Sequence, residues 1–305
     1  MADTTLDSTL KRQAFLFDAM EALKRNLLAI AIFAHRFNNV KLEGTDKLVV
    51  PYFPLHATAS KDFVAANGYV FDDNGTINGR EVTINKRKYQ ALAVTSAGAS
   101  RQPHLDLKRV AMQKGAKLGE DVVADILTLV TAANYGAAVL DSAPAAFTKE
   151  DVIDIRTACN QDHWGTAERS LVLSSSYTGN VMKDAVILDQ GSYGSGNPLL
   201  EGKVPRLSGF GLIENEIMPT NGEDLVGFAA LESAAIVGFS PITPEPRVLN
   251  ALNSYEAMED DETGLVMEYR EWGDPDLDMG KETIEVNYGY AFGEAAALKR
   301  IVDTA

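Results

Sequence analysis

The stretch His104–Asn134, HLDLKRVAMQKGAKLGEDVVADILTLVTAAN, predicts one long amphipathic helix. Its apolar residues recur every three, four or seven positions, a spacing that places their side chains on one helix face. They are Leu107, Ala111, Leu118, Val122, Ile126, Leu129 and Ala133. The opposite face carries Arg109, Gln113, Lys117, Glu120 and Asp125. A helix of roughly thirty residues is about 45 Å long, so we expect other parts of the chain to pack along it.

Two glycines, Gly115 and Gly119, lie inside this predicted helix. Each costs roughly 1 kcal/mol relative to alanine in a helix interior, so a compensating role is expected. One interpretation is that the small residues let a neighbouring element pack closely. The other is a hypothesis of flexibility, in which the glycines let the helix bend between two assembled states. Under that hypothesis, replacing both glycines with alanine traps one state.

The chain has 305 residues, of which 46% are hydrophobic, enough for a packed core and about two domains. Its net charge of -15 is unevenly distributed. Residues 1–110 carry fifteen Lys and Arg against eleven Asp and Glu, whereas residues 151–305 carry ten against twenty-seven. A nucleic-acid reader needs a basic face, and the acidic C-terminal half argues against one. An acidic excess of this kind is typical of a well-solvated surface.

No segment resembles a targeting signal or a membrane span. The first residues, MADTTLDSTLKR, contain acids and no apolar run of the signal-peptide type. The strongest apolar run, Leu27–Ala34, has eight residues, whereas a spanning helix needs about twenty. A soluble protein is therefore expected. The single cysteine, Cys159, has no partner for an internal disulfide, and we expect it to be small buried filler.

The N-terminal third predicts a helix followed by a long arm. Residues 9–34 have the apolar stripe of an amphipathic helix, which includes Phe17 and Leu23. Residues 46–54, DKLVVPYFP, predict a strand whose prolines exclude a central sheet position. Residues 80–95 predict a second strand. The sequence between these strands contains two tight-turn signals, Asn74-Gly75 and Asn78-Gly79.

Residues 46–95 are therefore expected to form a hairpin-like arm. The arm has few large apolar residues, and an isolated two-stranded ribbon is marginally stable in water, so it should lie on another surface. The basic group Lys86, Arg87 and Lys88 has two interpretations. It is either a solvated edge that blocks unwanted strand pairing or an intersubunit contact with acidic surface.

The C-terminal half mixes helices and strands without a regular alternation, which predicts the α+β class. A helix begins at a capping-box variant, Thr148 to Asp151, and buries one face that includes Cys159. The other predicted elements are strands over 170–174, 207–218, 265–272 and 283–292, a short helix over 177–185 and a compact apolar helix over 228–237.

Catalytic and metal-binding patterns are mostly missing from the sequence. There is no phosphate-binding loop and no nucleophile elbow, and we predict no catalytic residue and no cofactor. The weak metal candidate is Asp274, Asp276, Asp278 and Glu285, at positions one, three, five and twelve of a calcium-loop pattern. Met279 replaces the glycine that this loop needs at position six. The alternative is an acidic loop tip.

The succession of these parts resembles the major capsid (coat) protein of tailed bacteriophages, whose fold is shared with encapsulins and the herpesvirus capsid floor. The resemblance includes Trp164, Arg169 and Tyr177, the segment GKVPRLSGFGLIENEIMP over 202–219, and Tyr288-Gly289-Tyr290. It implies an α+β fold with an N-arm (1–45), an extended loop (46–102), a peripheral domain with a long spine helix (103–140 and 250–287) and an axial domain (141–249 and 288–305).

The resemblance also implies a structural function. The chain would self-assemble into pentamers and hexamers of an icosahedral shell that encloses double-stranded DNA without sequence specificity. Portal and separate scaffolding proteins would be further partners, and the virion would be made in the bacterial cytoplasm. The expected intersubunit contacts are Phe17, Leu23, Asn74, Asn78, Lys86, Arg87, Lys88, Asp274, Asp276 and Asp278. Two alternatives are an encapsulin-like compartment with protein cargo and a soluble hydrolase.

Some relatives join their subunits covalently through a Lys of the extended loop and an Asn of the peripheral hairpin tip. Lys86 or Lys88 could supply the amine, but the tip GDPDLDMG, residues 273–280, has no Asn. We therefore predict a shell without crosslinks. Boiled, denatured particles should run as a single monomer band on a gel, and a ladder of multimers would contradict this.

Overall fold

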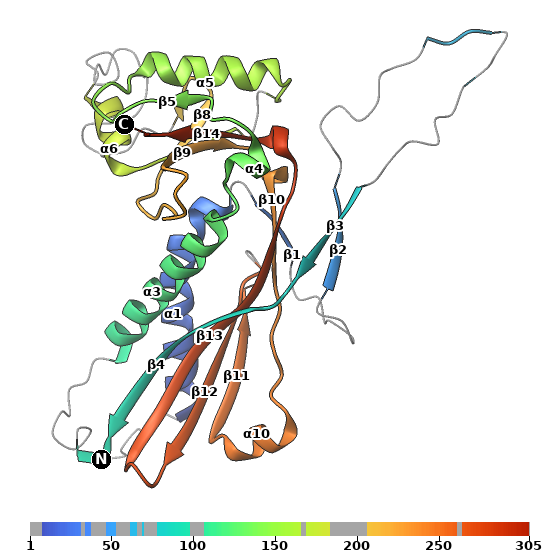
Figure 1. The fold of residues 1–305 in the computed structure, drawn as a ribbon. Coiled ribbons are helices and arrows are strands. Elements are labelled where there is room, and N and C mark those ends of the chain that lie inside the picture. The colour runs from blue at the N-terminus through green and yellow to red at the C-terminus, as the bar shows by residue number, and fades with distance from the viewer. Residues whose placement is uncertain are drawn as a thin grey trace.

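The computed structural model describes residues 8–31, 34–37, 47–52, 62–65, 69, 78–97, 107–165, 169–183, 206–260 and 264–304. These residues form an elongated body with one β-sheet toward each end, and a two-stranded ribbon lies beside the junction between them (Figure 1). The larger part contains a six-stranded sheet with long helices on one face. The smaller part contains a second six-stranded sheet, and the C-terminus lies there.

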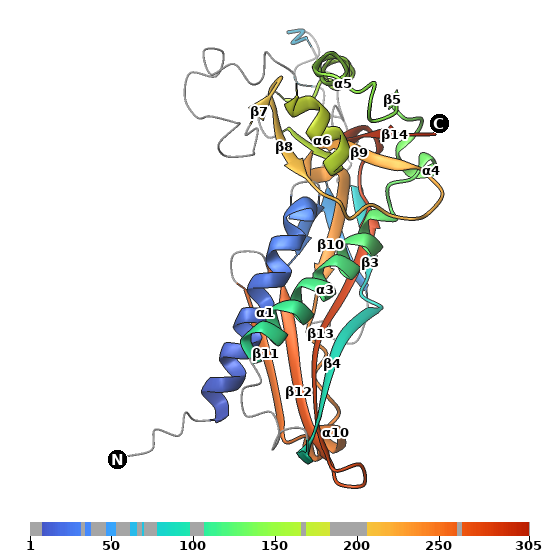
Figure 2. The same cartoon turned by 90° about the vertical axis from the view of Figure 1, so that its left-hand side faces the viewer.

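The larger sheet is organised around one long strand, β13 (Met279–Phe292). The other strands are β1 (Ala34–Phe37), β4 (Lys86–Thr95), β10 (Ala235–Phe239), β11 (Ser254–Glu259) and β12 (Val266–Asp274). Their order is β1-β10-β13-β12-β11, and β4 also pairs with β13. Helices α1 (Ser8–Ala31) and α3 (Leu107–Leu127) cover one face of this sheet (Figure 2). A short helix, α10 (Pro246–Ala251), precedes β11.

The smaller sheet has the order β5-β14-β9-β6-β8-β7. Its strands are β5 (Leu140–Asp141), β6 (Ser170–Leu173), β7 (Arg206–Leu207), β8 (Phe210–Glu214), β9 (Leu225–Ala230) and β14 (Leu298–Val302). Helices α5 (Lys149–Gln161) and α6 (Ser175–Met182) pack against it, with Cys159, Tyr177 and Phe210 in the shared core. Two 3-10 turns, η1 (Glu232–Ala234) and η2 (Ala295–Ala297), complete this end.

Several predicted elements are confirmed. The capping box at Thr148 and Asp151 is present at the start of α5, and Val152, Ile155 and Cys159 on one face of that helix are buried. Strands β6, β12 and β13 and helix α6 lie where the sequence predicts them, within a few residues. Cys159 is a buried free thiol, as expected of small core filler.

The predicted helix 104–134 is shorter than expected. Helix α3 ends at Leu127, and α4 (Ala132–Tyr135) follows after a turn. The amide groups of Thr128, Leu129 and Val130 donate to carbonyls three residues earlier, which tightens and ends the helix. Thr131 then caps α4 by accepting from the Asn134 amide at 3.2 Å. The apolar pattern continues through this break because the residues on both sides of it face the same core.

The N-terminal helix belongs to the core of its own chain, which corrects the expectation that Leu23 contacts a neighbouring subunit. Leu16, Ala19 and Leu23 are fully buried between α3 and the sheet. The ring of Phe15 meets that of Tyr269 edge to face, 6.0 Å between centroids. Leu23 is therefore unavailable as the intersubunit contact that was predicted.

At Gly115 and Gly119 the backbones of α1 and α3 approach each other closely. A Cβ atom at Gly115 would lie 2.2 Å from the carbonyl oxygen of Ala19, a distance that requires the backbones to move apart. A Cβ at Gly119 would lie 3.1 Å from the carbonyl oxygen of Leu23. This geometry favours the close-packing interpretation of the two glycines. The hypothesis of spine-helix flexibility stays a prediction.

The predicted helix over 228–237 is wrong. This segment forms the end of β9, the turn η1 and the start of β10. The physical reason is that both strands are buried on both faces, so the sequence is apolar throughout and carries no periodicity that separates a strand from a helix.

The predicted arm over 46–95 is only half correct. Strands β2 (Lys47–Tyr52) and β3 (Asn78–Thr83) pair as an antiparallel ribbon. The rest of the predicted second strand, β4, leaves the ribbon after Ile84 and Asn85 and pairs with β13 over ten residues. Residues 86–95 therefore belong to the larger sheet, which moves the boundary of the arm from the predicted range 46–102.

We predict that Gly115→Ala destabilises the chain. Helix propensity alone favours alanine by about 1 kcal/mol, but the clash with the Ala19 backbone should outweigh it and lower the free energy of unfolding by about 1–3 kcal/mol. Urea unfolding measures the change. Gly179→Ala in α6 is the matched control, because its Cβ meets nothing within 4 Å, and it should be neutral or slightly stabilising. A Gly115→Ala variant as stable as the wild type would contradict the packing role.

Candidate functional site

Three polar arrangements and one groove are the candidate functional features of the larger part. The first arrangement is centred on Lys86, which lies at the start of β4. Its ammonium group donates to both carboxylate oxygens of Asp125 on α3, at 2.9 and 3.0 Å, and to the Tyr290 hydroxyl at 2.5 Å. The ammonium also lies 4.3 Å from the centre of the Tyr290 ring. The Tyr288 hydroxyl donates to Asp125 at 2.7 Å. These contacts join β4, α3 and β13.

The ionised forms of this pair are stabilised in the fold. Burial alone would raise the pKa of Asp125, but hydrogen bonds from Lys86 and Tyr288 and the nearby positive charge hold that pKa below its ordinary value. Burial opposes ionisation of Lys86 in the same way, and its hydrogen bonds to Tyr290 and Asp125 raise its pKa above the ordinary value. The pair is therefore charged throughout the neutral range.

The second arrangement is a buried network on the other face of the sheet. Glu268 and Glu285 are direct partners across β12 and β13, and both are buried. Arg270 lies 2.6 Å from Glu285 and 3.1 Å from Glu268, and Arg87 on β4 donates to Glu285 at 2.5 Å. Glu268 also accepts from the Ile242 amide at 2.5 Å. Burial raises the pKa of Glu268, and its hydrogen bonds from Ile242 and Arg270 oppose that rise.

The basic group of residues 86–88 is used within the chain. Lys86 and Arg87 have the partners just described, and Lys88 donates to the Asp121 carbonyl on α3 at 2.5 Å. Both earlier interpretations of this group, a solvated edge and an intersubunit contact, stay predictions, because the side chains of Lys86 and Arg87 are still 38% and 44% exposed. The side chains of Lys86 and Lys88 hold β4 to α3 on one face of the sheet, and Arg87 holds it to Glu285 of β13 on the other, in keeping with the alternation of side chains along a strand.

The acidic tip is the third arrangement, and the structure does not bring the four candidate metal ligands together. Asp274 pairs with Lys281 at 2.6 Å, and Asp278 accepts from the Ser96 hydroxyl at 2.7 Å. Glu285 lies in the buried network with the arginines. Within the described ranges, no group of three or more potential ligand side chains converges. Asp274, Asp276 and Asp278 as intersubunit contacts remain a prediction.

The other predicted intersubunit residues have different outcomes. Phe17 has 59% of its surface exposed, so it remains available to a neighbour. Asn78 is the first residue of β3, opposite Tyr52, and its contact role stays a prediction. Asn74 lies outside the described residues.

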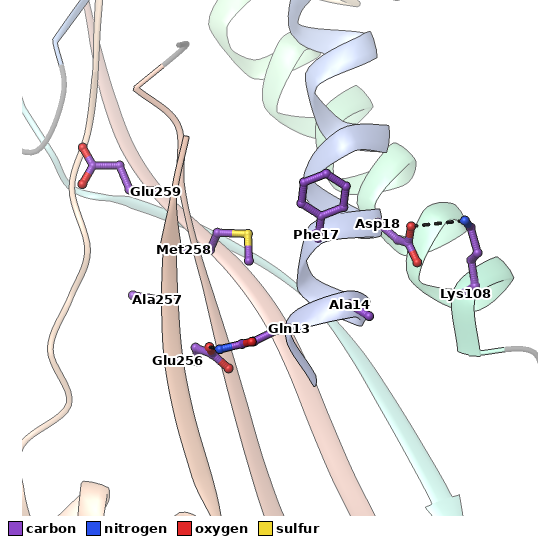
Figure 3. Close-up of a pocket in the computed structure, with 9 residues that line it drawn as sticks. All are labelled: Gln13, Ala14, Phe17, Asp18, Lys108, Glu256, Ala257, Met258 and Glu259. Carbon is purple, nitrogen blue, oxygen red and sulfur yellow. Dashed lines mark hydrogen bonds and ion pairs between the residues drawn. The ribbon is translucent and has the colours of Figure 1, made fainter. Parts of the chain in front are cut away.

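Phe17 lies on a groove between the N-terminal half of α1 and strand β11 (Figure 3). The groove has a volume of about 750 Å³ and is lined by Gln13, Ala14, Phe17, Asp18, Lys108 and residues 256–259. Gln13 donates to Glu256 across it at 3.0 Å, and Lys108 lies 3.5 Å from Asp18. Strand β11 pairs on one side only, with β12, among the strands that the structure describes.

Cys159 and His163 are four residues apart in the sequence, but they do not form a catalytic pair. The thiol is fully buried, and burial raises its pKa to about 11, which keeps it protonated and unreactive at neutral pH. His163 lies in the turn after α5 with a backbone φ of 56°. The neighbouring Trp164 indole donates to the Ala296 carbonyl at 2.8 Å, a structural contact with η2.

The roles of Asp125, Glu268 and Arg270 were not predicted from the sequence. Asp125 was placed on the solvated face of its helix, whereas β4 covers it. Strict alternation in the strand VMEYREW, residues 266–272, was the available signal for the other two, because it places Glu268, Arg270 and Trp272 on one face.

None of the described helices is long and apolar enough to span a membrane.

Comparison with known proteins finds similarity in structure only. No protein-family model matches the sequence. No curated protein matches it. Among solved structures, that of Mycobacterium phage Che8 is 16% identical, with a TM-score of 0.54 over 85% of each chain. The capsid structure of the cyanophage P-SCSP1u is 10% identical, with a TM-score of 0.58 over 89% of this chain and 86% of that one.

A crystal structure of a virus-like particle from Pyrococcus furiosus is also similar. It is 11% identical, with a TM-score of 0.54 over 95% of this chain and 98% of that one. The similarity extends over most of the chain in each case, with the same mixture of helices and sheets. The predicted fold class, the α+β fold of tailed-phage major capsid proteins, is confirmed.

We predict that Asp125→Asn removes an acid-sensitive part of the stability. The depressed pKa means that this contribution is present above the pKa of an unfolded aspartate, about 3.9. It is lost as the pH falls through the folded-state value. The variant should lose about 1–3 kcal/mol at pH 7 and should lose less than the wild type on acidification. Urea unfolding across this pH range measures both effects. Asp154→Asn, an exposed carboxyl on α5, is the control, and equal acid sensitivity in wild type and Asp125→Asn would contradict the assignment.

Proposed function

We propose that this chain is a structural protein, the major capsid subunit of a tailed bacteriophage. It would assemble into pentamers and hexamers of an icosahedral shell that encloses double-stranded DNA. The observation that carries this proposal is the fold, which matches phage capsid structures over most of the chain. The role is architectural, and no catalytic residue or cofactor is assigned.

The ribbon supports a self-associating function. Strands β2 and β3 pair with each other and, among the described strands, with no third one. Val50 and Val82 pack on Ile236 at the base of the ribbon, but Val49 is 64% exposed, and Phe63 and Tyr69 beyond it are 61% and 80% exposed. A two-stranded ribbon with exposed apolar residues is marginal alone, so contact with a neighbouring copy would stabilise it.

The domain division of the sequence is proposed with one change. The N-arm (1–45) and the axial domain (141–249 and 288–305) keep their predicted ranges. The extended loop ends near residue 85, and the peripheral domain gains residues 86–95, because β4 pairs with β13 in the larger sheet. The acidic net charge of -15 fits DNA that is enclosed by a shell rather than read by a basic surface. A portal and a separate scaffolding protein are proposed partners, and assembly would take place in the bacterial cytoplasm.

An encapsulin-like compartment is the second candidate. The similarity to an archaeal virus-like particle favours it, because that structure matches over 95% of this chain. Phage structures are the more numerous matches, so they favour the phage capsid. A soluble hydrolase is not supported by any catalytic arrangement among the described residues.

Electron microscopy of particles from native and recombinant sources tests the proposal. Uniform closed shells should form from the purified chain. Native particles should contain DNA that resists nuclease until the shell is disrupted. Shells that contain protein cargo and no DNA would favour the encapsulin-like alternative. A monomer that stays monomeric at high concentration would contradict both.

A further inference from the structure

Helix α10 is an exposed element with an apolar and basic surface. None of its six residues is buried. Val248 and Leu249 are 44% and 42% exposed, and the Arg247 side chain is 92% exposed, with Glu245 at 3.8 Å as its ion-pair partner. Large aliphatic side chains on a helix usually face a core. Because Val248 and Leu249 are exposed beside the guanidinium group of Arg247, α10 is a candidate contact element on the surface.

The α1/β11 groove has the complementary character. Phe17, Ala14 and Met258 provide apolar lining, and Phe17 is 59% exposed. Three carboxylates lie along the groove (Asp18, Glu256 and Glu259), against one ammonium group, that of Lys108. In Figure 3, Glu256 points toward α1 and meets Gln13, whereas Glu259 points away from α1. The groove therefore combines apolar lining residues with the carboxylate of Glu256, whereas the carboxylate of Asp18 already lies beside Lys108.

These two features lie on opposite faces of the larger sheet. Phe15 of α1 packs on Tyr269. Val248 of α10 and Leu252, which follows α10, line a cavity together with Arg270 and Trp272 of β12. Arg270 is the residue that follows Tyr269 along β12. Adjacent residues of a strand point to opposite faces. One copy therefore cannot insert its own α10 into its own groove, whereas a second copy can.

We infer that α10 of one copy docks in the α1/β11 groove of the next copy. Leu249 would cover Phe17, and Arg247 would approach the carboxylate of Glu256. A contact between two different surfaces of identical chains leaves one free α10 and one free groove at the ends, so it propagates and closes into rings. The inference rests on the proposed shell function and specifies one contact surface of that assembly.

Charge reversal tests the contact. Arg247→Glu places a carboxylate against that of Glu256, and Glu256→Lys places a lysine against Arg247. Like-charge contacts oppose association, so each variant alone should reduce the fraction of protein that sediments as shells by at least about tenfold. The double variant Arg247→Glu/Glu256→Lys should restore assembly. Every contact in a ring of five or six copies is then the reversed pair, a glutamate at position 247 against a lysine at position 256.

Controls separate this contact from effects on folding and net charge. Both residues are at the surface, so circular dichroism should show wild-type secondary structure in each variant. Arg156→Glu, the same charge reversal at an exposed position on α5, should assemble normally. Wild-type assembly by Arg247→Glu, loss of assembly in Arg156→Glu, or failure of the double variant to recover would each overturn the inference. Failure of the wild-type chain to form shells would instead contradict the proposed function.

Discussion

The close contact between α1 and α3 is the constraint on which the larger part depends. At Gly115 and Gly119 the two helix backbones approach until a single added carbon would clash. This approach lets both helices cover one face of the sheet, so that Leu16 and Leu23 from one and Leu118 and Val122 from the other share a core with β12 and β13. Without it, the sheet face that contains Tyr269 and Val286 would lose its cover.

Charged groups complete the assembly of elements around this core. Lys86 ties β4 to α3 through Asp125, and Arg87, next along the strand, ties β4 to Glu285 on the opposite face. Both carboxylates are largely removed from solvent, so breaking either pair removes a partner of a buried charge. Glu285 would keep Arg270 as its second partner. The larger part is thus held together by the apolar packing of α1 against α3 and by ion pairs on both faces of β4, the strand that leads to the ribbon. The groove and α10 are the surfaces that this construction leaves open.

Sequence patterns predicted the elements with a clear period or a clear terminus. The helix α5 was found by its capping box, and α3 by its repeating apolar residues. The segment Phe228–Val237 was assigned to a helix because strands buried on both faces show no alternation. The pairing of Glu268 with Glu285 depends on the register of β12 against β13, which no local pattern states. Helix α10 has six residues, too few for a period to be measured.

The direct connection from β3 to β4 has a mechanical consequence. Two residues separate a strand of the ribbon from a strand that pairs with β13 over ten residues, and the two strands run in a similar direction (Figure 1). Tension applied to the ribbon by a neighbouring molecule would act nearly along β4. Its hydrogen bonds would then share the load in shear instead of opening one after another, and the ribbon would transmit force into the body as a tether that is fixed along its length.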